Sequence, residues 1–502
     1  MTHSQTSRRI LLVYPQYPDT FWSYRRALRF IGRKASLPPM GLLTVASMLP
    51  SGWELRFTDT NIDALRDEDI RWADYVFISA MTVQKESARE IIGRCKALGT
   101  PVVAGGPLFT ALSAEFQEVD HLVLDEAELT LPQFLEDMEE GRLQRTYRSS
   151  EWADLNTTPV PAWDLIDFSN YATMCVQYSR GCPFDCEFCD ITVLYGRAPR
   201  CKTSARVLAE LDVLYERGWR GAVFFVDDNF IGNKRVLKQE LLPAVIEWME
   251  AHGHPFSFLT QVSINLAADD ELIELMVRAG FDMVFIGIET PDEQSLIECG
   301  KMQNTRSDML ADVYKLHEAG LQVQAGFIVG FDSDKNDIFG RISRFINESG
   351  IVASMVGLLN APPNTRLYKR LLSENRILKG ISGSNTDFSI NFLPRMDTSA
   401  LVEGYRKIIQ DVYHPEAYYR RVRAFLRHFN PRNKFNGGLF SKTYARGFFM
   451  SIYRLGIRKG VRRHYWRLVA WTLLRRPRLI PYAITMAIYG DHFMKHFGIV
   501  SE

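Results

Sequence analysis

Short apolar runs alternate with segments of helical periodicity over the first 145 residues. Five runs have the length and composition of strands: Arg9–Tyr14, Leu55–Asp59, Tyr75–Ser79, Pro101–Gly105 and Leu122–Leu124. Apolar positions recur at helical spacing over Gly41–Leu49, and helices are also predicted at about 84–98 and 129–140. Such runs separated by helices are typical of a parallel sheet covered on both faces. The pattern predicts a doubly wound, Rossmann-like α/β domain over residues 1–145, with its ligand beyond the carboxyl ends of the strands.

A second series of strands and helices follows a connecting segment. Residues 146–170 contain Pro159, Pro161 and several small polar residues, so they are predicted to be a linker. Six strands are then predicted over 171–395: Cys175–Ser179, Gly221–Val226, Phe256–Thr260, Met283–Ile288, Val323–Gly330 and Ser354–Leu359. Helical patterns follow the strands, as at Asp269–Ala279 and Thr305–Ala319. Six such units fit a partial (β/α)6 barrel, whose reactive groups stand at the carboxyl ends of the strands.

The pattern changes again over residues 396–502, where long helices are predicted at Gly404–Tyr419, Lys442–Val469 and Ile480–Phe497. The chain is 46% hydrophobic with a net charge of +1, but this balance hides an asymmetry. Residues 417–490 hold 17 Lys and Arg and no Asp or Glu, so an acidic body carries a basic tail. No apolar run is long enough for a membrane span, and no signal peptide is recognisable. These features predict a cytoplasmic protein.

The tail also carries aromatic residues among its basic ones. The interleaved residues are Phe448, Phe449, Tyr465, Trp466, Trp471, Arg454, Arg458, Arg462, Arg463, Arg475 and Arg476. Such a composition favours an amphipathic surface that binds anionic lipid, which predicts a peripheral membrane protein on the inner face. Two alternatives remain: a basic aromatic surface that binds RNA, and a solvated helical cap that closes the open side of the barrel. We expect no nucleic-acid partner.

Three cysteines lie close together in Arg180-Gly-Cys-Pro-Phe-Asp-Cys-Glu-Phe-Cys189. Cys182, Cys186 and Cys189 form a C-x3-C-x2-C pattern that suits one face of a cubic iron–sulfur cluster. Because such a cluster takes four ligands, three cysteines leave one iron open to a ligand that is not protein. A structural zinc loop is the alternative, but zinc needs four protein ligands and no further pair is near. The remaining cysteines of this half of the chain are interpreted as structural: Cys175, Cys201 and Cys299.

With Phe188 as the aromatic, this loop resembles the C-x3-C-x-aromatic-C motif of the radical S-adenosylmethionine (SAM) superfamily. In that family the open iron of a [4Fe-4S] cluster chelates SAM, which is cleaved to a 5′-deoxyadenosyl radical. The resemblance implies that SAM is held by residues at the ends of the second, fourth and fifth barrel strands. Those residues are Asp227, Asp228, Asn229, Glu289, Gly326, Ile328 and Gly330. Each of them, considered singly, fits a helix cap or a turn equally well.

The first domain resembles the cobalamin-binding domain fused to many radical enzymes. The resemblance is carried by Ser79-Ala-Met-Thr-Val-Gln84, Val103-Ala-Gly-Gly-Pro107 and Val123-Leu-Asp-Glu-Ala-Glu128. It implies cobalamin contacts from Ser79, Met81, Thr82, Gly105, Gly106 and Glu126. Members that ligate cobalt from below often use Asp-x-His-x-x-Gly, but here Asn61 replaces the His and Ala64 the Gly. Cobalamin is therefore expected to lack a histidine lower ligand, unless His3 or His121 supplies one; a relic domain that has lost cobalamin is the alternative.

The tail, with Asn391-Phe-Leu-Pro394 and Tyr418-Tyr-Arg-Arg421, resembles that of radical enzymes acting on polycyclic or isoprenoid lipids, in particular the hopanoid C-2 methylases. This implies a cobalamin-dependent methyltransferase acting on an unactivated carbon of a lipid-like or natural-product substrate. One SAM would methylate cobalt and a second would give the radical, with electrons from an external flavodoxin- or ferredoxin-type donor. Two alternatives remain open: cyclisation or rearrangement without methyl transfer, and a sensor or binding protein. No catalytic residue beyond the cofactor ligands is predicted.

Overall fold

The computed structural model describes residues 7–378, 380–432, 442–457 and 460–501. Its first sheet has six parallel strands in the order β2-β1-β3-β4-β5-β6. The strands are β1 (Arg9–Tyr14), β2 (Glu54–Asp59), β3 (Tyr75–Ser79), β4 (Val102–Gly105), β5 (His121–Val123) and β6 (Thr146–Tyr147). The predicted Rossmann-like domain is confirmed. One strand extends beyond the prediction, because β6 lies in the segment that was interpreted as a linker.

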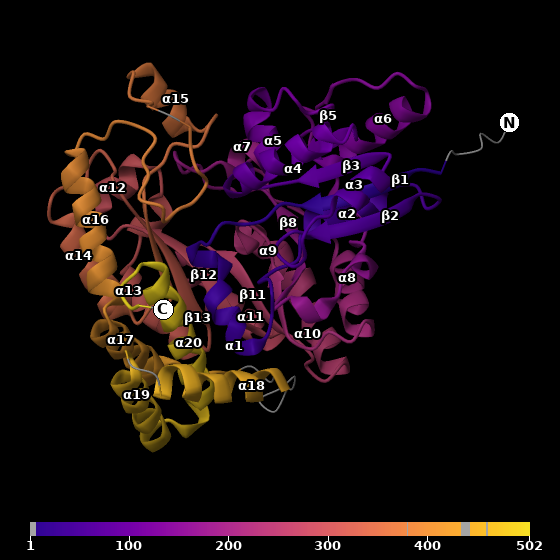
Figure 1. The fold of residues 1–502 in the computed structure, drawn as a ribbon. Helices are drawn as coiled ribbons and strands as arrows, with labels where there is room; N and C mark the ends of the chain where they lie inside the picture. Colours follow the sequence, from indigo (N-terminus) through magenta and orange to yellow (C-terminus); the bar gives the residue numbers. More distant parts are fainter. Residues whose placement is uncertain (1–6, 379, 433–441, 458–459, 502) are drawn as a thin grey trace.

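Alternating side chains along each strand bury against helices on opposite faces of this sheet (Figure 1). Leu12 and Phe77 pack with α2 (Met40–Met48) and α6 (Ala127–Glu139). Their neighbours Leu11 and Val76 pack on the other face. That face is covered by α3 (Asp67–Trp72), α4 (Lys85–Ala97) and α5 (Pro107–Leu112). Burial on both faces explains why these strands are uniformly apolar.

The second sheet is also fully parallel, in the order β14-β13-β12-β11-β10-β7. Its strands are β7 (Met174–Val176), β10 (Ala222–Phe225), β11 (Ser257–Val262), β12 (Phe281–Glu289), β13 (Gln322–Val329) and β14 (Ser354–Leu358). The main helices between them are α8 (Ser204–Glu216), α10 (Leu242–Ala251), α11 (Asp270–Ala279), α13 (Met309–Ala319) and α14 (Ile338–Ser349). Strands β14 and β7 are edges, so the barrel is open between them. The partial (β/α)6 barrel is therefore confirmed. A separate two-stranded sheet, β8 (Ser179–Arg180) and β9 (Arg200–Cys201), flanks the cysteine loop.

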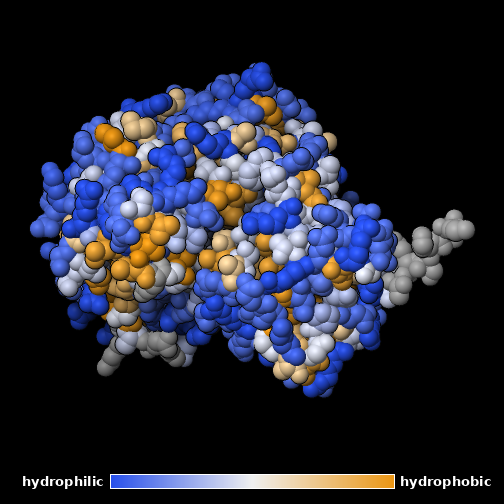
Figure 2. All heavy atoms as spheres, turned by 90° about the horizontal axis from the view of Figure 1, so that it is seen from above, coloured by the Kyte–Doolittle hydropathy of each residue, from blue (hydrophilic) through white to orange (hydrophobic). Residues whose placement is uncertain are grey.

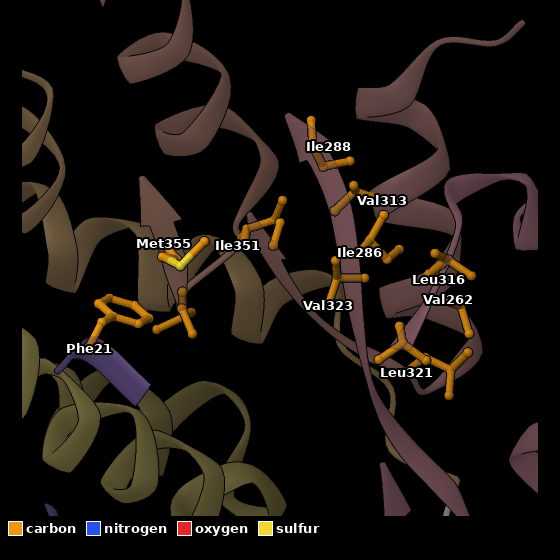
Figure 3. Close-up of a cluster of buried hydrophobic side chains, with 14 of the residues drawn as sticks. Phe21, Val262, Ile286, Ile288, Val313, Leu316, Leu321, Val323, Ile351 and Met355 are labelled. Carbon is orange, nitrogen blue, oxygen red and sulfur yellow. The ribbon is translucent and has the colours of Figure 1, made fainter. Parts of the chain in front are cut away.

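The outer face of this sheet is packed against its helices. Figure 3 shows Ile286 and Val323 from neighbouring strands beside Val313 and Leu316 of α13. All four side chains are completely buried. Because side chains alternate along a strand, Phe285 and the other residues in its register point to the inside of the barrel.

The connection from β1 to α2, residues 15–39, crosses from the first domain to the rest of the molecule. We call it the crossover segment. Its helix α1 (Arg25–Ile31) packs between α18 (Lys442–Ser451) and α20 (Ile480–His496) of the tail, and the indigo ribbon lies beside the yellow one (Figure 1). The Phe21 ring stacks on that of Phe493 at 4.2 Å between centroids. The first 145 residues therefore form one sheet domain plus a segment that belongs to the core of the barrel and tail.

The tail is helical, as predicted, but its helices begin and end at other residues. They are α16 (Thr398–Tyr413), α17 (Pro415–His428), α18, α19 (Arg462–Arg475) and α20, and α15 (Arg366–Ser373) precedes the tail. The helix predicted at 404–419 is wrong in extent, because Pro415 begins a new helix after His414. The helix predicted at 442–469 is likewise divided, by a π-helical turn at Ile452–Ile457. Within the described ranges, no helix is long and apolar enough to cross a membrane.

The tail is held to the barrel by buried polar contacts. The hydroxyls of Tyr405 and Tyr413 donate to the carbonyls of Val356 and Ser354 on β14, at 3.0 and 2.6 Å. Arg421 is completely buried and donates to Val412 O at 2.9 Å. The cap that covers this edge of the barrel is therefore part of one continuous core. In contrast, the face seen from above is mostly hydrophilic, with hydrophobic atoms in separate groups (Figure 2).

Replacement of Phe21 by Ala tests how firmly the crossover segment is built into this core. Phe21 is 1% exposed, so Phe21→Ala leaves a cavity and should lower the free energy of unfolding by about 3 kcal/mol. Phe449, 68% exposed, is the matched control, and Phe449→Ala should change it by less than about 0.5 kcal/mol. Urea-induced unfolding measures both. Equal small effects would show that the segment only rests on the surface.

Candidate functional site

The cysteine loop is fixed by its backbone. Gly181 has φ of 93°, and a Cβ at this position would lie 2.9 Å from the Ala198 carbonyl oxygen, so only glycine fits. Cys182 N donates to Gly196 O at 3.3 Å, and Glu187 N donates to Cys299 O at 2.8 Å. The loop thus has one defined shape between β8 and α7 (Ile191–Tyr195).

The donor set of this loop fits a cubic cluster. Cys182, Cys186 and Cys189 are free thiols close enough to influence one another electrostatically. Burial raises the pKa of each, so iron has to displace the thiol protons. Three cysteines of such a cluster bind three different irons, which sets them further apart than the ligands of a single ion. Among the described residues, no three His, Cys, Asp or Glu are spaced to hold one metal ion.

A buried ion pair lies beside these thiols. Glu289, at the end of β12, has φ of 64° and accepts from Lys301 in a contact that is covered from solvent. Burial lowers the pKa of Lys301, but the Glu289 and Cys186 charges outweigh it and raise the pKa overall. Asn229 also lies beside the thiols, with its Nδ2 3.9 Å from Cys182 Sγ. Lys301 was missed by the sequence analysis, because it follows no strand and its partner lies 12 residues away.

The two aspartates after β10 differ in role. Asp227 is completely buried and accepts from Tyr178 N at 3.2 Å and from the backbone and hydroxyl of Ser179. Its oxygens are therefore taken by the strand that leads into the cysteine loop, which differs from the SAM contact predicted for it. Asp228 makes no such contact with that strand. Burial and the Asp227 and Asp190 carboxylates raise the pKa of Asp228 to about 7.

The glycines at strand β13 are covered by other side chains. Gly326 faces the Phe285 ring, which would lie 3.1 Å from a Cβ at that position. Gly330 directly follows the strand with φ of 108°, and a Cβ there would lie 3.2 Å from Leu401. Its N–H donates to Asp334 at 2.8 Å. Ile328 is the one partly exposed residue of the strand, so it is the residue of this set that a ligand can reach.

A cleft lies between the carboxyl edge of the first sheet and helix α7, which directly follows the cysteine loop. Thr82, Thr110 and Asp125 line it from one side, Asp190 and Leu194 from the other. Its remaining lining residues are Ala111, Leu112, Arg148, Val193, Pro362, Pro363, Asn364 and Ile381. Hydroxyl and carboxylate groups beside apolar side chains suit a flat macrocycle with amide substituents, so the donor set fits cobalamin.

Of the predicted cobalamin contacts, Thr82 lines this cleft, and Ser79, Met81, Gly105 and Gly106 lie at or just after the ends of β3 and β4. Met81 is 42% exposed beside it. Gly106 has φ of 87°, and a Cβ there would lie 2.6 Å from Ser79 Oγ. A Cβ on Gly105 would meet Val123 O at 2.5 Å. The glycines therefore let the ends of β3, β4 and β5 come close together.

Glu126 has a different position from the one predicted. Its side chain is 1% exposed and pairs with Arg180 at 3.0 Å and with Arg200 at 2.9 Å. Glu128 pairs with Arg180 at 2.7 Å. Burial favours the protonated form of Glu128, but Arg180 lowers its pKa to about 2. Glu126 therefore joins the first domain to the start of the cysteine loop rather than lining the cleft.

The residues near the expected lower-ligand position are bonded internally. Asn61 donates to Asp59 Oδ1 at 2.7 Å and to Pro15 O at 3.2 Å, and it accepts from Tyr17 N at 2.8 Å. His121 lies at the start of β5, at the opposite end from the cleft, and pairs with Gln144 O at 2.7 Å. His3 lies outside the described residues.

Comparisons with known proteins agree with this arrangement. Residues 176–346 match the radical SAM superfamily, residues 30–135 the B12 binding domain, and residues 365–502 a domain of unknown function (DUF4070). An uncharacterized methyltransferase of Synechocystis sp. is 43% identical over 98% of this chain and 93% of that protein. The hopanoid C-2 methylase of Rhodopseudomonas palustris is 34% identical over 94% of this chain and 90% of that protein. The chain belongs to the family of radical SAM methyltransferases that carry a B12-binding domain.

Solved structures share the fold of this chain. The cobalamin-dependent radical SAM enzyme OxsB superimposes with a TM-score of 0.63 at 16% identity, covering 99% of this chain and 82% of that one. The radical SAM methyltransferase TsrM from Kitasatospora setae gives 0.61 at 14% identity, covering 95% and 99%. The domain matches confirm the predicted cofactor classes: cobalamin, an iron–sulfur cluster and SAM.

Replacement of Asp227 and replacement of Asp228 should have different effects on the protein. Asp228→Ala should weaken SAM binding by about ten- to hundredfold with iron content unchanged, since a charge-assisted hydrogen bond contributes about 1.5–3 kcal/mol. Asp227→Ala should instead lower iron content and thermal stability, because it leaves the Tyr178 and Ser179 donors without an acceptor. Equilibrium dialysis with SAM and iron analysis of the reconstituted proteins measure both. The assignment fails if the two variants behave alike.

Proposed function

We propose that this protein transfers methyl groups from SAM to an unactivated carbon of a hopanoid-like or other isoprenoid lipid. The cleft carries the proposal, because it lies between the carboxyl edge of the first sheet and helix α7, which directly follows the cysteine loop. Cobalamin and SAM would thus react with one substrate held between them. The lipid class is supported by the 34% identical hopanoid C-2 methylase and by the apolar side chains on the inner face of the barrel.

Each group of residues has a part in this reaction. Cys182, Cys186 and Cys189 would hold the cluster, and Asp228 and the end of β13 would orient SAM beside it. When bound, the cluster supplies an electron from a flavodoxin- or ferredoxin-type donor that cleaves SAM, and cobalamin supplies the methyl carrier. The buried pair formed by Glu289 and Lys301 places a fixed positive charge beside the thiolates. Residues from α7 and from the loop after β14 line the cleft, where they would stand beside the radical.

Methyl incorporation tests the proposal against its main alternative, cyclisation or rearrangement without methyl transfer. The reconstituted protein, a chemical reductant and SAM with a trideuterated methyl group should convert a pentacyclic hopanoid to a product heavier by one labelled methyl. Mass spectrometry of the extracted lipid measures it, and a protein lacking all three cluster cysteines is the control. If SAM is cleaved but the lipid product is an isomer of the substrate that carries no label, the alternative is favoured. Lack of any 5′-deoxyadenosine would favour a sensor.

The hydrogen bonds of Asn61 support cobalamin without a protein lower ligand, because an amide is a poor donor to cobalt and this one is already bonded. We expect the tail base to be displaced as well, so paramagnetic resonance of the bound cob(II)alamin should show no nitrogen superhyperfine splitting. Free base-on cob(II)alamin is the reference that shows the splitting. A triplet in the protein-bound spectrum would mean that a nitrogen ligand is present.

The tail offers a surface for the membrane in which such a lipid resides. Eight large hydrophobic side chains of 444–474 are exposed, and we call them the basal surface: Tyr444, Phe448, Phe449, Tyr453, Ile457, Trp466, Leu473 and Leu474. Arg462, Arg463 and Arg467 are exposed on α19, while Arg458 lies outside the described residues. Each basic residue near an anionic bilayer contributes about 1 kcal/mol. A solvated cap remains the alternative.

Vesicle binding tests the basal surface. The protein should sediment with vesicles of phosphatidylglycerol and phosphatidylcholine, and less so at high salt because the attraction is screened. Phe449→Asp combined with Leu474→Asp should reduce the bound fraction severalfold. Leu372→Asp, on α15 far from α18 and α19, changes another exposed hydrophobic residue and should have no effect (Figure 1). Equal binding by all three proteins would exclude the basal surface.

A further inference from the structure

The crossover segment closes the open side of the barrel. A βα loop usually has about two to six residues, whereas this one runs from 15 to 39. Near one end, Ala35 pairs with Tyr171 just before edge strand β7. Near the other end, the Trp22 Nε1 donates to Met355 Sδ on edge strand β14 at 3.1 Å. The segment therefore spans the gap between the two edge strands.

The inner face of the barrel sheet is partly exposed, whereas its outer face is covered by helices. On β11 and β12 the buried outer residues alternate with partly exposed inner ones. The partly exposed inner residues that would contact a substrate are Leu259, Gln261, Met283, Phe285 and Ile328. Four of these five are apolar. A ligand that enters from the cofactor edge therefore meets a hydrophobic wall.

Trp22 stands at the inner end of this wall. Its ring meets the edge of Phe285 at 5.4 Å between centroids, with the planes at 81°. Met355 of β14 lies opposite Gly326 of β13. Gly330, which directly follows β13, is four residues further along, so the two glycines are separated by about 13 Å along the strand. Trp22 keeps part of its surface exposed, whereas Phe21 beside it is only 1% exposed. Trp22 is thus positioned to touch a ligand about 13 Å from the cofactor edge.

The tail fixes the position of Trp22. Phe21 stacks on Phe493, and its carbonyl accepts from His492 Nε2 at 2.9 Å. Tyr24 has the left-handed φ of 47°, which turns the chain two residues after Trp22. Figure 3 shows Phe21 and Met355 close together beside the tail helices. The indole therefore has tail packing on one side and the barrel interior on the other.

We propose that Trp22 forms the end wall of the substrate site and limits the length of the apolar polycyclic lipid that can bind. The inference rests on the proposed function for the substrate class, but the wall itself follows from the contacts above. A residue of the cobalamin-binding half would then determine specificity inside the barrel. Trp22 is accordingly a specificity residue, and none of the cofactor ligands described above is among its contacts.

The test uses dehydroergosterol, a fluorescent tetracyclic sterol, with the reconstituted full-length protein. Energy transfer from tryptophan to the sterol gives the dissociation constant without any turnover. Trp22→Ala should weaken binding by about tenfold, because it removes apolar surface from a hydrophobic pocket. Trp22→Phe keeps an aromatic ring against Phe285 and should stay within about threefold of the unchanged protein. Trp72→Ala, a partly exposed tryptophan on α3 of the first domain, is the matched control and should bind normally.

The outcomes separate this inference from the proposed function. Equal dissociation constants for the unchanged protein and Trp22→Ala would overturn the end wall, as would a lack of sterol binding by the unchanged protein. Sterol binding that depends on Trp22, in a protein that incorporates no labelled methyl, would keep the wall and overturn the methyl transfer. Cobalamin content shows whether each variant is folded, and Trp22→Leu takes the place of Trp22→Ala if the latter loses cobalamin.

Discussion

The ion pairs of Arg180 hold the two cofactor-binding halves in a fixed relation. Arg180 directly precedes Gly181 and the first cluster cysteine, and it contacts two carboxylates that follow β5 of the first sheet. Removal of one member of a buried pair costs about 3–5 kcal/mol, because the remaining charge is left unpaired. A shift of the first domain would therefore expose or unpair these charges. The position of the first sheet relative to the cysteine loop is thus fixed by an ion-pair group that directly precedes this loop.

The tail and the crossover segment complete an incomplete barrel. Six strands leave an opening, and in this chain a segment of the first domain fills it while α16 covers β14. The core of the barrel consequently includes Phe21 from near the amino terminus and Phe493 from near the carboxyl terminus. The predicted boundaries 145, 170 and 395 therefore separate stretches of sequence that contribute to one core. That core brings together residues of the first domain, the barrel and the tail.

Strands and the cysteine loop were predictable because their signals are local. Uniformly apolar runs marked both sheets, and the spacing from Cys182 to Cys189 identified the loop. Helix breaks in the tail were missed because the basic, aromatic composition continues through them, although Pro415 was a visible signal. Asp227 and Glu126 were placed by their position after strands, but their partners lie 48 and 54 residues away, beyond the reach of any local pattern. The role of the crossover segment depends on contacts with residues more than 300 positions distant, so only the fold could show it.

The central claim is that a radical formed on SAM and a methyl group carried by cobalamin meet at one carbon of a lipid. Incubation of the reconstituted protein with a fully deuterated pentacyclic hopanoid and unlabelled SAM tests it most directly. The account predicts 5′-deoxyadenosine that carries one deuterium for each methyl group gained by the lipid. Methylated lipid accompanied by 5′-deoxyadenosine without deuterium would contradict it, because the methyl group would then have been added without hydrogen abstraction from the substrate.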